Sequence, residues 1–457
     1  MKKIQYWCDP DDTALLTDLY HLTTAQSFHA EKMNEVATFE LYFRSLPDKR
    51  NYLVASGVHE ALDYLETLRF TDKAVNYLAS LAQFSPAFLD WLAKLRFTGD
   101  VYAVPEGTIV FGLEPVVQIV APLIEAQIVK SFLVNMVHYQ TLVASKAARV
   151  VCAAGGRSVI DFGMRHTHGP AAAMLAAKAG YLSGLEATSN VLAGKEYGIP
   201  VAGTMAHSYI QSHDDEGQAF REFVRLYPET TLLVDTYDTL EGVRKVVSLA
   251  QTMGKDFDVR AVRLDSGDLV NLSEQARRIL DDAGLDHVRI IASGNLDEYG
   301  IARIMAAAAP VDAFGVGTRL GVSQDAPYLD SAYKLVEYRG EGRLKFGDHR
   351  TATLPWRKQV FRQEEGGVWA RDVIARCDER LPGVPLLEQV MRAGKRLPDA
   401  ELDLQRARLR VREQLAALPR HLLGLAQADP QFDIVPSPLI VSERDRLAGR
   451  FSWTPTA

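Results

Sequence analysis

The sequence predicts an α/β protein whose middle part is built from repeated βα units. Short runs rich in β-branched residues recur there, each followed by a polar or glycine-bearing turn. Between them, residues 239–254 and 268–284 carry apolar residues at helical spacing and end in glycine, as helices commonly do. Strands joined by crossover helices form a parallel sheet, and periodicity alone leaves open whether that sheet is doubly wound or closed as a barrel.

Six segments are candidate strands of this sheet, and they begin at Ser158, Gly198, Thr231, Val259, Val288 and Val311. The flanks of the chain mix the two patterns. Residues 64–84 and 403–419 are expected to be helical, and residues 37–47, 100–112 and 358–362 to be strands. Because no low-complexity linker separates the flanks from the middle, we expect packed flanking domains.

The composition is that of a soluble globular protein. The chain has 457 residues, of which 47% are hydrophobic and 24% charged, so it is long enough for more than one compact core. Its formal net charge of -7 argues against a broad nucleic-acid surface, which needs a basic face. Any anionic ligand must therefore be bound locally.

Cysteine usage and hydropathy favour a cytoplasmic protein. Cys8, Cys152 and Cys377 lie far apart, which argues against a disulfide framework and a cysteine-based zinc site. The first residues lack the apolar segment of a signal peptide. The apolar stretch 116–129 is interrupted by glutamine, proline and glutamate, so we expect no membrane span.

Polar or glycine-rich clusters follow nearly every candidate strand, where the loops of a parallel βα fold converge on a ligand. They are residues 161–165, His207, Asp235, and residues 263–268, 293–295 and 315–318. The glycines at 294, 315 and 317 let backbone N–H groups approach an anion, although for either segment alone a tight turn is the preferred interpretation. Two such turns after successive strands favour a phosphate site.

Arg263 and Asp265 stand together in the segment 263–268. Arginine suits a carboxylate or phosphate, and aspartate suits ribose hydroxyls or hydrated Mg²⁺. Either Asp265 or Asp268 could instead cap the next helix, and for Asp268 capping is the preferred interpretation.

The segment 161–169 places Arg165, His166 and His168 beside a strand end. A flat anionic ligand stacked on Phe162 would suit this cluster, and an ordinary strand-to-helix turn is the alternative. No glutamate accompanies these histidines in the pattern of a zinc protease, so the segment does not indicate a metal site.

His207 and His213 follow the candidate strand at 198. A lone histidine is often a packed or capping residue, and no serine, histidine and aspartate order is readable here. Local sequence leaves His207 open between a chemical and a structural role, and it favours a surface position for His213.

The ordered set of motifs resembles the nicotinate phosphoribosyltransferases. The set comprises LLTDLYHLTTAQSF, FELYFRSLP, DFGMRHTHGP, TSNVLAGKEYGIPVAGTMAHS, VRLDSGDL, SGNLDE, FGVGT, YKLVEY and LPWRKQVFR, within about residues 12–365. The resemblance implies an irregular or incomplete βα barrel plus an α/β domain formed from both chain ends. It places an N-terminal α/β domain at 1–145, the barrel at 146–345 and a C-terminal segment that packs on the N-terminal domain at 346–457. It also implies a homodimer with shared active sites.

The resemblance further implies a reaction of NAD salvage. Nicotinate and 5-phosphoribosyl 1-pyrophosphate would give nicotinate mononucleotide and pyrophosphate, with Mg²⁺ on the substrate phosphates, possible contact near Asp265 and no metal cage made by the protein. ATP hydrolysis would be coupled to the reaction through transient phosphorylation of His207.

By the same resemblance, Tyr20, Phe162, Arg165 and Arg263 would hold nicotinate. Arg263 and Asp265 would act in catalysis, and ribose and phosphate would contact Asp265, Ser293, Gly294, Asn295, Gly317 and Thr318.

The chain departs from the family at His166, where members often have a second arginine, and residues beyond about 370 match no motif of known role. Two alternatives share the fold: a nicotinamide phosphoribosyltransferase and a nicotinate sensor without turnover. A barrel aldolase or isomerase is less consistent with the sequence, because no lysine stands at the strand ends.

Overall fold

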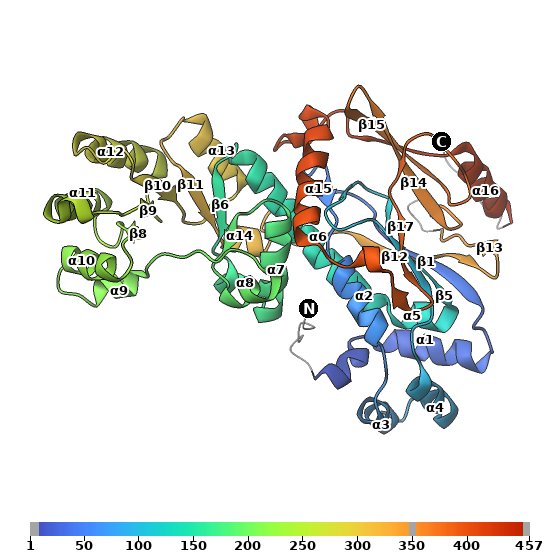
Figure 1. Ribbon diagram of the computed structural model, residues 1–457. Helices are drawn as coiled ribbons and strands as arrows, with labels where there is room; N and C mark the ends of the chain where they lie inside the picture. The colour runs from blue at the N-terminus through green and yellow to red at the C-terminus, as the bar shows by residue number, and fades with distance from the viewer. Residues whose placement is uncertain (1–8, 347–352, 451–457) are drawn as a thin grey trace. The chain divides into compact units, whose positions relative to one another are not determined.

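The computed structural model describes residues 9–346 and 353–450, which form two compact units (Figure 1). One unit combines residues 1–145 with 326–457, and the other is residues 146–325. The boundary expected near residue 345 differs from the one observed. The reason is β12 (Ser331–Tyr338), which pairs antiparallel with β1 (Val36–Phe43) and so belongs to the unit made from both chain ends.

The unit of residues 146–325, here called the barrel unit, contains a six-stranded parallel sheet. Its strands are β6 (Ser158–Asp161), β7 (Ala187–Thr188), β8 (Thr231–Leu233), β9 (Ala261–Leu264), β10 (Arg289–Ala292) and β11 (Ala313–Val316). The spatial order β7-β6-β11-β10-β9-β8 is chain order read as a ring, because β11 returns to pair with β6. This order is that of a barrel and not of a doubly wound sheet. The ladder stays open between β8 and the segment after β7, so the barrel is incomplete.

Five of the six candidate strands are confirmed, and the one expected at Gly198 is wrong. Its only ladder contact is a single parallel bridge between Val201 and Thr188. Gly198 ends α8 (Val191–Tyr197) with a φ of 68°, and Pro200 has no N–H to donate to a ladder. The strand β7 was not predicted, because two residues are too few for an alternating pattern.

Helices connect the strands and begin at capping residues that the sequence provides. The helices of the barrel unit after β6 are α7 (Pro170–Leu182), α8, α9 (His207–Gln211), α10 (Glu216–Leu226), α11 (Thr239–Met253), α12 (Leu269–Asp282), α13 (Glu298–Ala306) and α14 (Thr318–Gly321). The side chains of Asp215, Asp238, Asp268 and Asp297 accept backbone N–H bonds at the starts of α10 to α13. Asp268 is therefore a helix cap, as preferred from the sequence.

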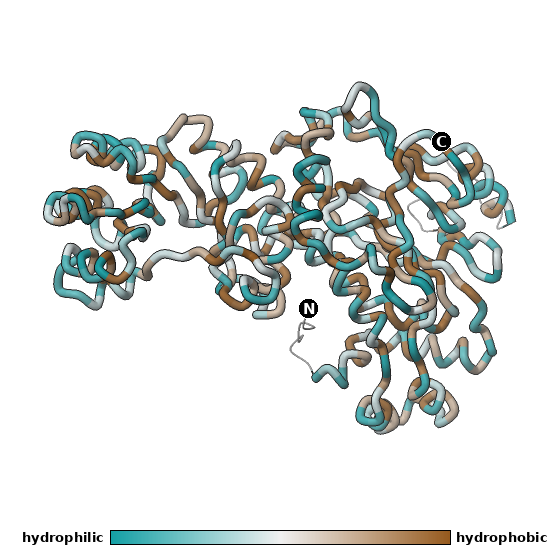
Figure 2. The backbone as a smooth tube through the Cα atoms, viewed as in Figure 1, coloured by the Kyte–Doolittle hydropathy of each residue, from teal (hydrophilic) through white to brown (hydrophobic). Residues whose placement is uncertain are grey.

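Alternation along the strands separates a core face from a polar face. Val262 and Leu264 of β9 are buried in the apolar core under the helices. Arg263 lies between them and so points to the opposite face of the sheet, where it is in register with Ile291 of β10. Figure 2 shows the same separation in α11 and α12, whose outer sides are mostly hydrophilic.

The unit made from both chain ends contains a seven-stranded sheet in the order β13-β12-β1-β5-β3-β17-β18, in addition to two smaller sheets. The remaining strands of the seven are β13 (Glu341–Gly342), β5 (Pro115–Pro122), β3 (Asp100–Ala103), β17 (Glu388–Arg392) and β18 (Lys395–Arg396). The smaller sheets comprise β2 (Leu53–Val54), β4 (Ile109–Val110), β14 (Lys358–Glu365), β15 (Val368–Arg376), β16 (Val384–Pro385) and β19 (Asp433–Pro436).

The helical pattern expected at 403–419 is confirmed, whereas the one expected at 64–84 is divided between two helices with a break at residues 68–71. The helices of this unit are α1 (Leu19–Ala30), α2 (Val58–Thr67), α3 (Asp72–Ser80), α4 (Pro86–Lys94), α5 (Leu123–Ile128), α15 (Leu404–Ala417), α16 (Pro438–Gly449) and α6 (Lys130–Ala153), which contains the boundary at residue 145. A search of the described helices finds none with the length and apolarity that a membrane crossing requires. Cys152 and Cys377 are free thiols, and Cys8 lies outside the described residues.

Candidate active site

Arg263 is the centre of a polar cluster at the carboxyl ends of the barrel strands. Its Nε donates to Oγ of Ser293 over 2.8 Å, and its two terminal nitrogens donate to Thr204 and Asp265 over 3.1 and 2.6 Å. The Arg263 side chain is only 13% exposed. Three of its five N–H donors are used in this way, so the guanidinium is held in one orientation with donors left for a ligand.

Phe162 lies beneath this cation. Its ring centroid is 4.9 Å from the guanidinium carbon of Arg263, and its backbone N–H donates to the carbonyl of Val316 over 2.6 Å. A Cβ on Gly315 would stand 2.6 Å from the Phe162 ring. The absence of a side chain at position 315 therefore makes room for the aromatic ring beside the cation.

Asp265 is ionised by its surroundings. Burial raises the pKa of this carboxyl, but the hydrogen bond from Ser293 and the charge of Arg263 outweigh burial, and the pKa is lowered overall. A Cβ on Gly294 would lie 1.9 Å from the carbonyl oxygen of Asp265, and Gly294 has a φ of 96°. Only glycine fits this turn, which packs the 293–295 loop directly on the Asp265 backbone.

His207 lies at the start of α9 and contacts Asp235, which follows β8. Its Nε2 is 3.2 Å from Oδ1 of Asp235. The His207 side chain is 42% exposed, whereas that of Asp235 is 2% exposed. The other oxygen of Asp235 accepts from the Asp265 backbone N–H over 3.1 Å and from Ser266 Oγ over 2.6 Å. Asp235 thus connects the histidine to the Arg263 cluster.

The turn after β6 is held by a buried carboxyl. Asp161 accepts from the Gly163 N–H and from Thr188 Oγ1, both over 2.7 Å, and burial raises its pKa. Arg165 is exposed at this turn and makes no ion pair among the described residues. His166, next to it, is hydrogen-bonded through Nδ1 to Oγ1 of Thr318. The turn therefore carries one unpaired cation and one contact to the glycine loop after β11.

The two glycine loops are tied together by an ion pair. Asp297, after the 293–295 loop, accepts from the Gly300 N–H over 2.8 Å and from Arg319 over 2.7 Å. Arg319 directly follows Thr318. Asn295 has a φ of 52°, a conformation that asparagine tolerates better than most residues. These contacts fix the two loops that the sequence predicts to bind phosphate.

Tyr20 belongs to the other unit, where it lies on α1. It is 51% exposed, and Lys130 Nζ donates to its hydroxyl over 3.0 Å. The neighbouring His21 is fully buried and bonded to Gln127, and burial, with the nearby charge of Lys130, lowers its pKa to about 4. All the other predicted site residues are in the barrel unit.

The sequence did not indicate Thr204 as a site residue, and it did not indicate which residue Asp235 contacts. Both are recognisable afterwards, since Thr204 lies three residues before His207 and Asp235 ends a predicted strand. Their pairing with Arg263 and His207 is between different βα units, so no local pattern could indicate it. His213 follows α9, is half-buried, and donates from Nδ1 to the Tyr209 carbonyl of that helix over 2.8 Å.

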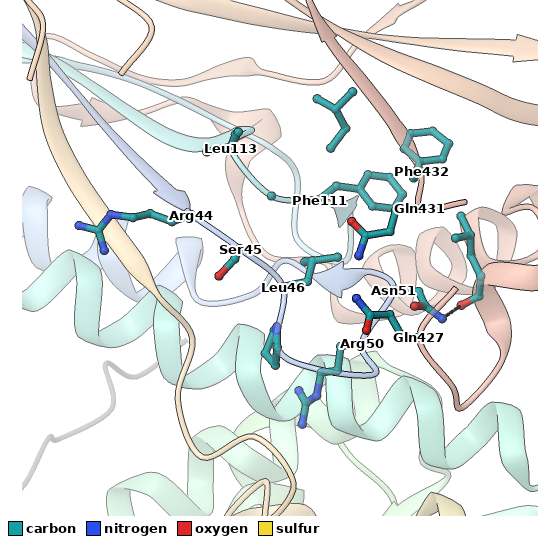
Figure 3. A pocket seen from close by; sticks show the side chains of 14 residues that line it. Arg44, Ser45, Leu46, Arg50, Asn51, Phe111, Leu113, Gln427, Gln431 and Phe432 are labelled. Atoms are coloured by element: carbon teal, nitrogen blue, oxygen red, sulfur yellow. Dashed lines mark hydrogen bonds between the residues drawn. The ribbon is translucent and has the colours of Figure 1, made fainter. Parts of the chain in front are cut away.

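The described residues contain no group of three or more histidine, cysteine or carboxylate side chains that could hold a metal ion. A cavity of about 400 Å³ lies elsewhere, in the unit made from both chain ends (Figure 3). It contains none of the predicted site residues. Of its two arginines, Arg44 is paired with Asp330, and Arg50 is buried and donates to the Leu142 carbonyl over 3.1 Å. The polar cluster, and not this cavity, has the groups that chemistry requires.

Comparison with known proteins identifies the family. Residues 15–138 match the nicotinate phosphoribosyltransferase N-terminal domain, and residues 158–345 match the nicotinate phosphoribosyltransferase family. The chain is 52% identical over 434 residues to nicotinate phosphoribosyltransferase pncB2 of Mycobacterium tuberculosis, covering 95% of this chain and 94% of that protein. It is 40% identical over 366 residues to nicotinate phosphoribosyltransferase of Bacillus subtilis, covering 79% and 75%.

The fold agrees with a solved relative. The crystal structure of human nicotinic acid phosphoribosyltransferase superposes with a TM-score of 0.85 at 27% identity, covering 94% of this chain and 99% of that one. The motifs read from the sequence, the incomplete barrel and the whole-length similarity agree, and the chain belongs to the nicotinate phosphoribosyltransferase family.

Proposed function

We propose that this enzyme joins nicotinate to 5-phosphoribosyl 1-pyrophosphate, giving nicotinate mononucleotide and pyrophosphate. The observation that carries the proposal is the Arg263 cluster, in which a fixed cation stands between Phe162, Asp265 and Ser293. In the reaction, the pyridine nitrogen forms a bond to ribose C1 as the bond from C1 to the pyrophosphate oxygen breaks. The ring nitrogen already has a lone pair, so the step needs no general base.

In this proposal, nicotinate is bound by the aromatic ring of Phe162 and by two cations, Arg263 and Arg165. Phe162 offers a flat apolar surface, and Arg263 stands beside it with free donors for a carboxylate. Arg165 is exposed and unpaired among the described residues, so it can turn toward the same anion. Tyr20 would complete the pyridine site in the functional assembly.

Ribose and phosphate binding follow from the loops after β9, β10 and β11. The ionised Asp265 suits ribose hydroxyls, and Ser293, Gly294, Asn295, Gly317 and Thr318 supply backbone N–H and hydroxyl groups for the 5-phosphate. Mg²⁺ would arrive with the substrate phosphates, since Asp265 uses Oδ1 on Arg263 and leaves Oδ2 for a metal or a hydroxyl. When bound there, the metal would supply positive charge to the pyrophosphate leaving group.

Energy coupling would use His207 as a phosphoryl acceptor. A carboxylate only accepts hydrogen bonds, so contact with Asp235 puts the ring proton on Nε2 and the lone pair on Nδ1. Nδ1 would attack the terminal phosphorus of ATP, ADP would leave, and water would later cleave the N–P bond to release phosphate. Phosphohistidine adds negative charge and acceptor oxygens beside the cluster.

The assembly and location complete the proposal. We expect a homodimer in which each active site takes residues from both copies, and a cytoplasmic enzyme. Both expectations come from the family resemblance and the cysteine usage.

The test combines the protein with phosphoribosyl pyrophosphate, Mg²⁺ and either nicotinate or nicotinamide, with and without γ-labelled ATP. Nicotinate turnover that ATP stimulates, with acid-labile label on the wild type and none on His207→Asn, supports the proposed reaction and its coupling to ATP through His207. Turnover of nicotinamide alone would indicate the sister activity, and binding without pyrophosphate release would indicate a sensor.

A further inference from the structure

His166 is fixed at one end of its ring and free at the other. It ends the 3-10 turn η2 (Met164–His166), and its backbone N–H donates to the Gly163 carbonyl over 2.9 Å. Its Nδ1 is bonded to Oγ1 of Thr318. The side chain is exposed, and Nε2 has no partner among the described residues. A ligand at the loop of Gly317 and Thr318 would therefore meet a ring nitrogen already aimed by a neighbouring contact.

The charges around His166 favour an anion. Arg165 precedes it in the same turn, and the sole charged residue of α7, which packs on this turn, is the fully buried Lys178. On α14, which also contacts the turn, the charged residue is Arg319, and it is paired with Asp297. None of these three elements carries an acidic side chain. Asp161, at the end of β6, uses its two oxygens on Gly163 and Thr188.

Imidazole changes its charge between about pH 5 and 8. Its protonated form donates from both nitrogens, one to Thr318 and one outward. A bound phosphate stabilises this form, so the extra affinity is present when the ring is protonated and is lost as the pH rises. An arginine at the same position would keep its charge throughout.

We infer that His166 is a direct ligand of the 5-phosphate of phosphoribosyl pyrophosphate and makes the binding of that substrate depend on pH. This inference rests on the proposed role of Gly317 and Thr318 as the 5-phosphate loop. It requires neither ATP nor His207, so it is tested without them.

The experiment measures KM for phosphoribosyl pyrophosphate at saturating nicotinate, without ATP, across about pH 6 to 8.5, spanning the imidazole range. As the pH is raised over this range, KM of the wild type should increase roughly tenfold more than KM of His166→Gln. That factor is the loss of affinity expected when one charge-assisted hydrogen bond is removed. His166→Arg should keep a low KM with little rise. The substrate's own phosphates also titrate, but their effect on KM is the same for every variant. It therefore cancels when the variants are compared.

His168→Gln is the matched control, because His168 is also exposed and lies two residues along. It should keep the wild-type pH profile. An identical profile in wild type and His166→Gln overturns the inference, and so does a profile that moves equally in His168→Gln. Thr318→Val tests the underlying site: it should raise KM at every pH, and no effect would overturn the phosphate loop itself. A wild type that forms no product from nicotinate even when ATP is added would instead overturn the proposed function.

Discussion

Nε2 of His207 lies 3.2 Å from Oδ1 of Asp235, and the second oxygen of Asp235 accepts from the backbone of Asp265 and the hydroxyl of Ser266. The half-exposed imidazole is thereby oriented by a carboxylate that is itself held in place. The remaining nitrogen, Nδ1, is the one left for chemistry.

Asp235→Asn should separate this orientation from simple packing. An amide can donate to Nε2 and move the proton to Nδ1, the wrong tautomer for attack, as in triads whose aspartate is replaced. In Asp235→Asn we expect at least a roughly tenfold loss of ATP stimulation and smaller changes in KM for nicotinate. In the wild type we expect the phosphoryl label on Nδ1 of His207. Labelling kinetics and phosphorus NMR of the denatured phosphoprotein would measure these effects. Label on Nε2 would contradict the assignment.

Arg263→Lys should impair nicotinate binding although it keeps the charge. Lysine cannot reproduce the planar fork that contacts Ser293, Thr204 and Asp265 together. We expect KM for nicotinate to rise about tenfold or more, as one charged hydrogen bond is worth about 1.5–3 kcal/mol. Steady-state kinetics with nicotinate varied would show this, and an unchanged KM would exclude carboxylate recognition by Arg263.

Gly315→Ala should displace Phe162. The new methyl group would stand 2.6 Å from the ring, and overpacking of this kind costs about 1–3 kcal/mol. We expect a lower urea midpoint and a higher KM for nicotinate. Gly449→Ala is the control, because a Cβ there has open space. If the urea midpoint and the KM for nicotinate changed equally in the two variants, the space that Gly315 leaves for the Phe162 ring would have no role in stability or binding.

Lys146→Met should be strongly destabilising. The buried ammonium lies 2.5 Å from Glu298 and 2.6 Å from Asp325, and its loss leaves buried carboxylate charge with less compensation. A cost of about 3–5 kcal/mol is expected for such a broken pair. Chemical denaturation would measure it, with Lys195→Met as the exposed control. A loss below about 1 kcal/mol, the range of surface pairs, would contradict this view.

His21 should make the protein sensitive to acid. Burial, with the nearby charge of Lys130, lowers its pKa from an ordinary 6.5 to about 4, so the unfolded chain binds a proton that the folded chain refuses. Stability is therefore lost as the pH falls from about 6.5 toward about 4, by the linkage rule.

Urea midpoints at several pH values would test this sensitivity. His21→Gln should lose less stability over that window than the wild type, whereas the exposed His287→Gln should follow the wild type. Parallel curves for all three proteins would refute the prediction.

Local patterns were sufficient for much of the fold because they depend on neighbours in the chain. Helices ending in glycine, aspartate caps such as Asp268, and β-branched runs such as 288–291 all report the conformation of a few successive residues. The same logic failed at Gly198, where Pro200 breaks a strand that the apolar pattern favours, and at β7, which is too short to have a pattern.

The sequence by itself determined the α/β class, the family through its ordered motifs, and the positions of Arg263, Asp265 and His207 at or just after predicted strands. Strand periodicity left a doubly wound sheet and a barrel both open, the family resemblance implied an incomplete barrel, and the pairing of β11 with β6 confirms it. Only the tertiary structure decided that Arg263 meets Thr204 and Ser293 while His207 meets Asp235. The physical reason is that these contacts join residues about 30 to 60 positions apart. Their geometry is set by strand pairing and packing and not by any local preference of the chain.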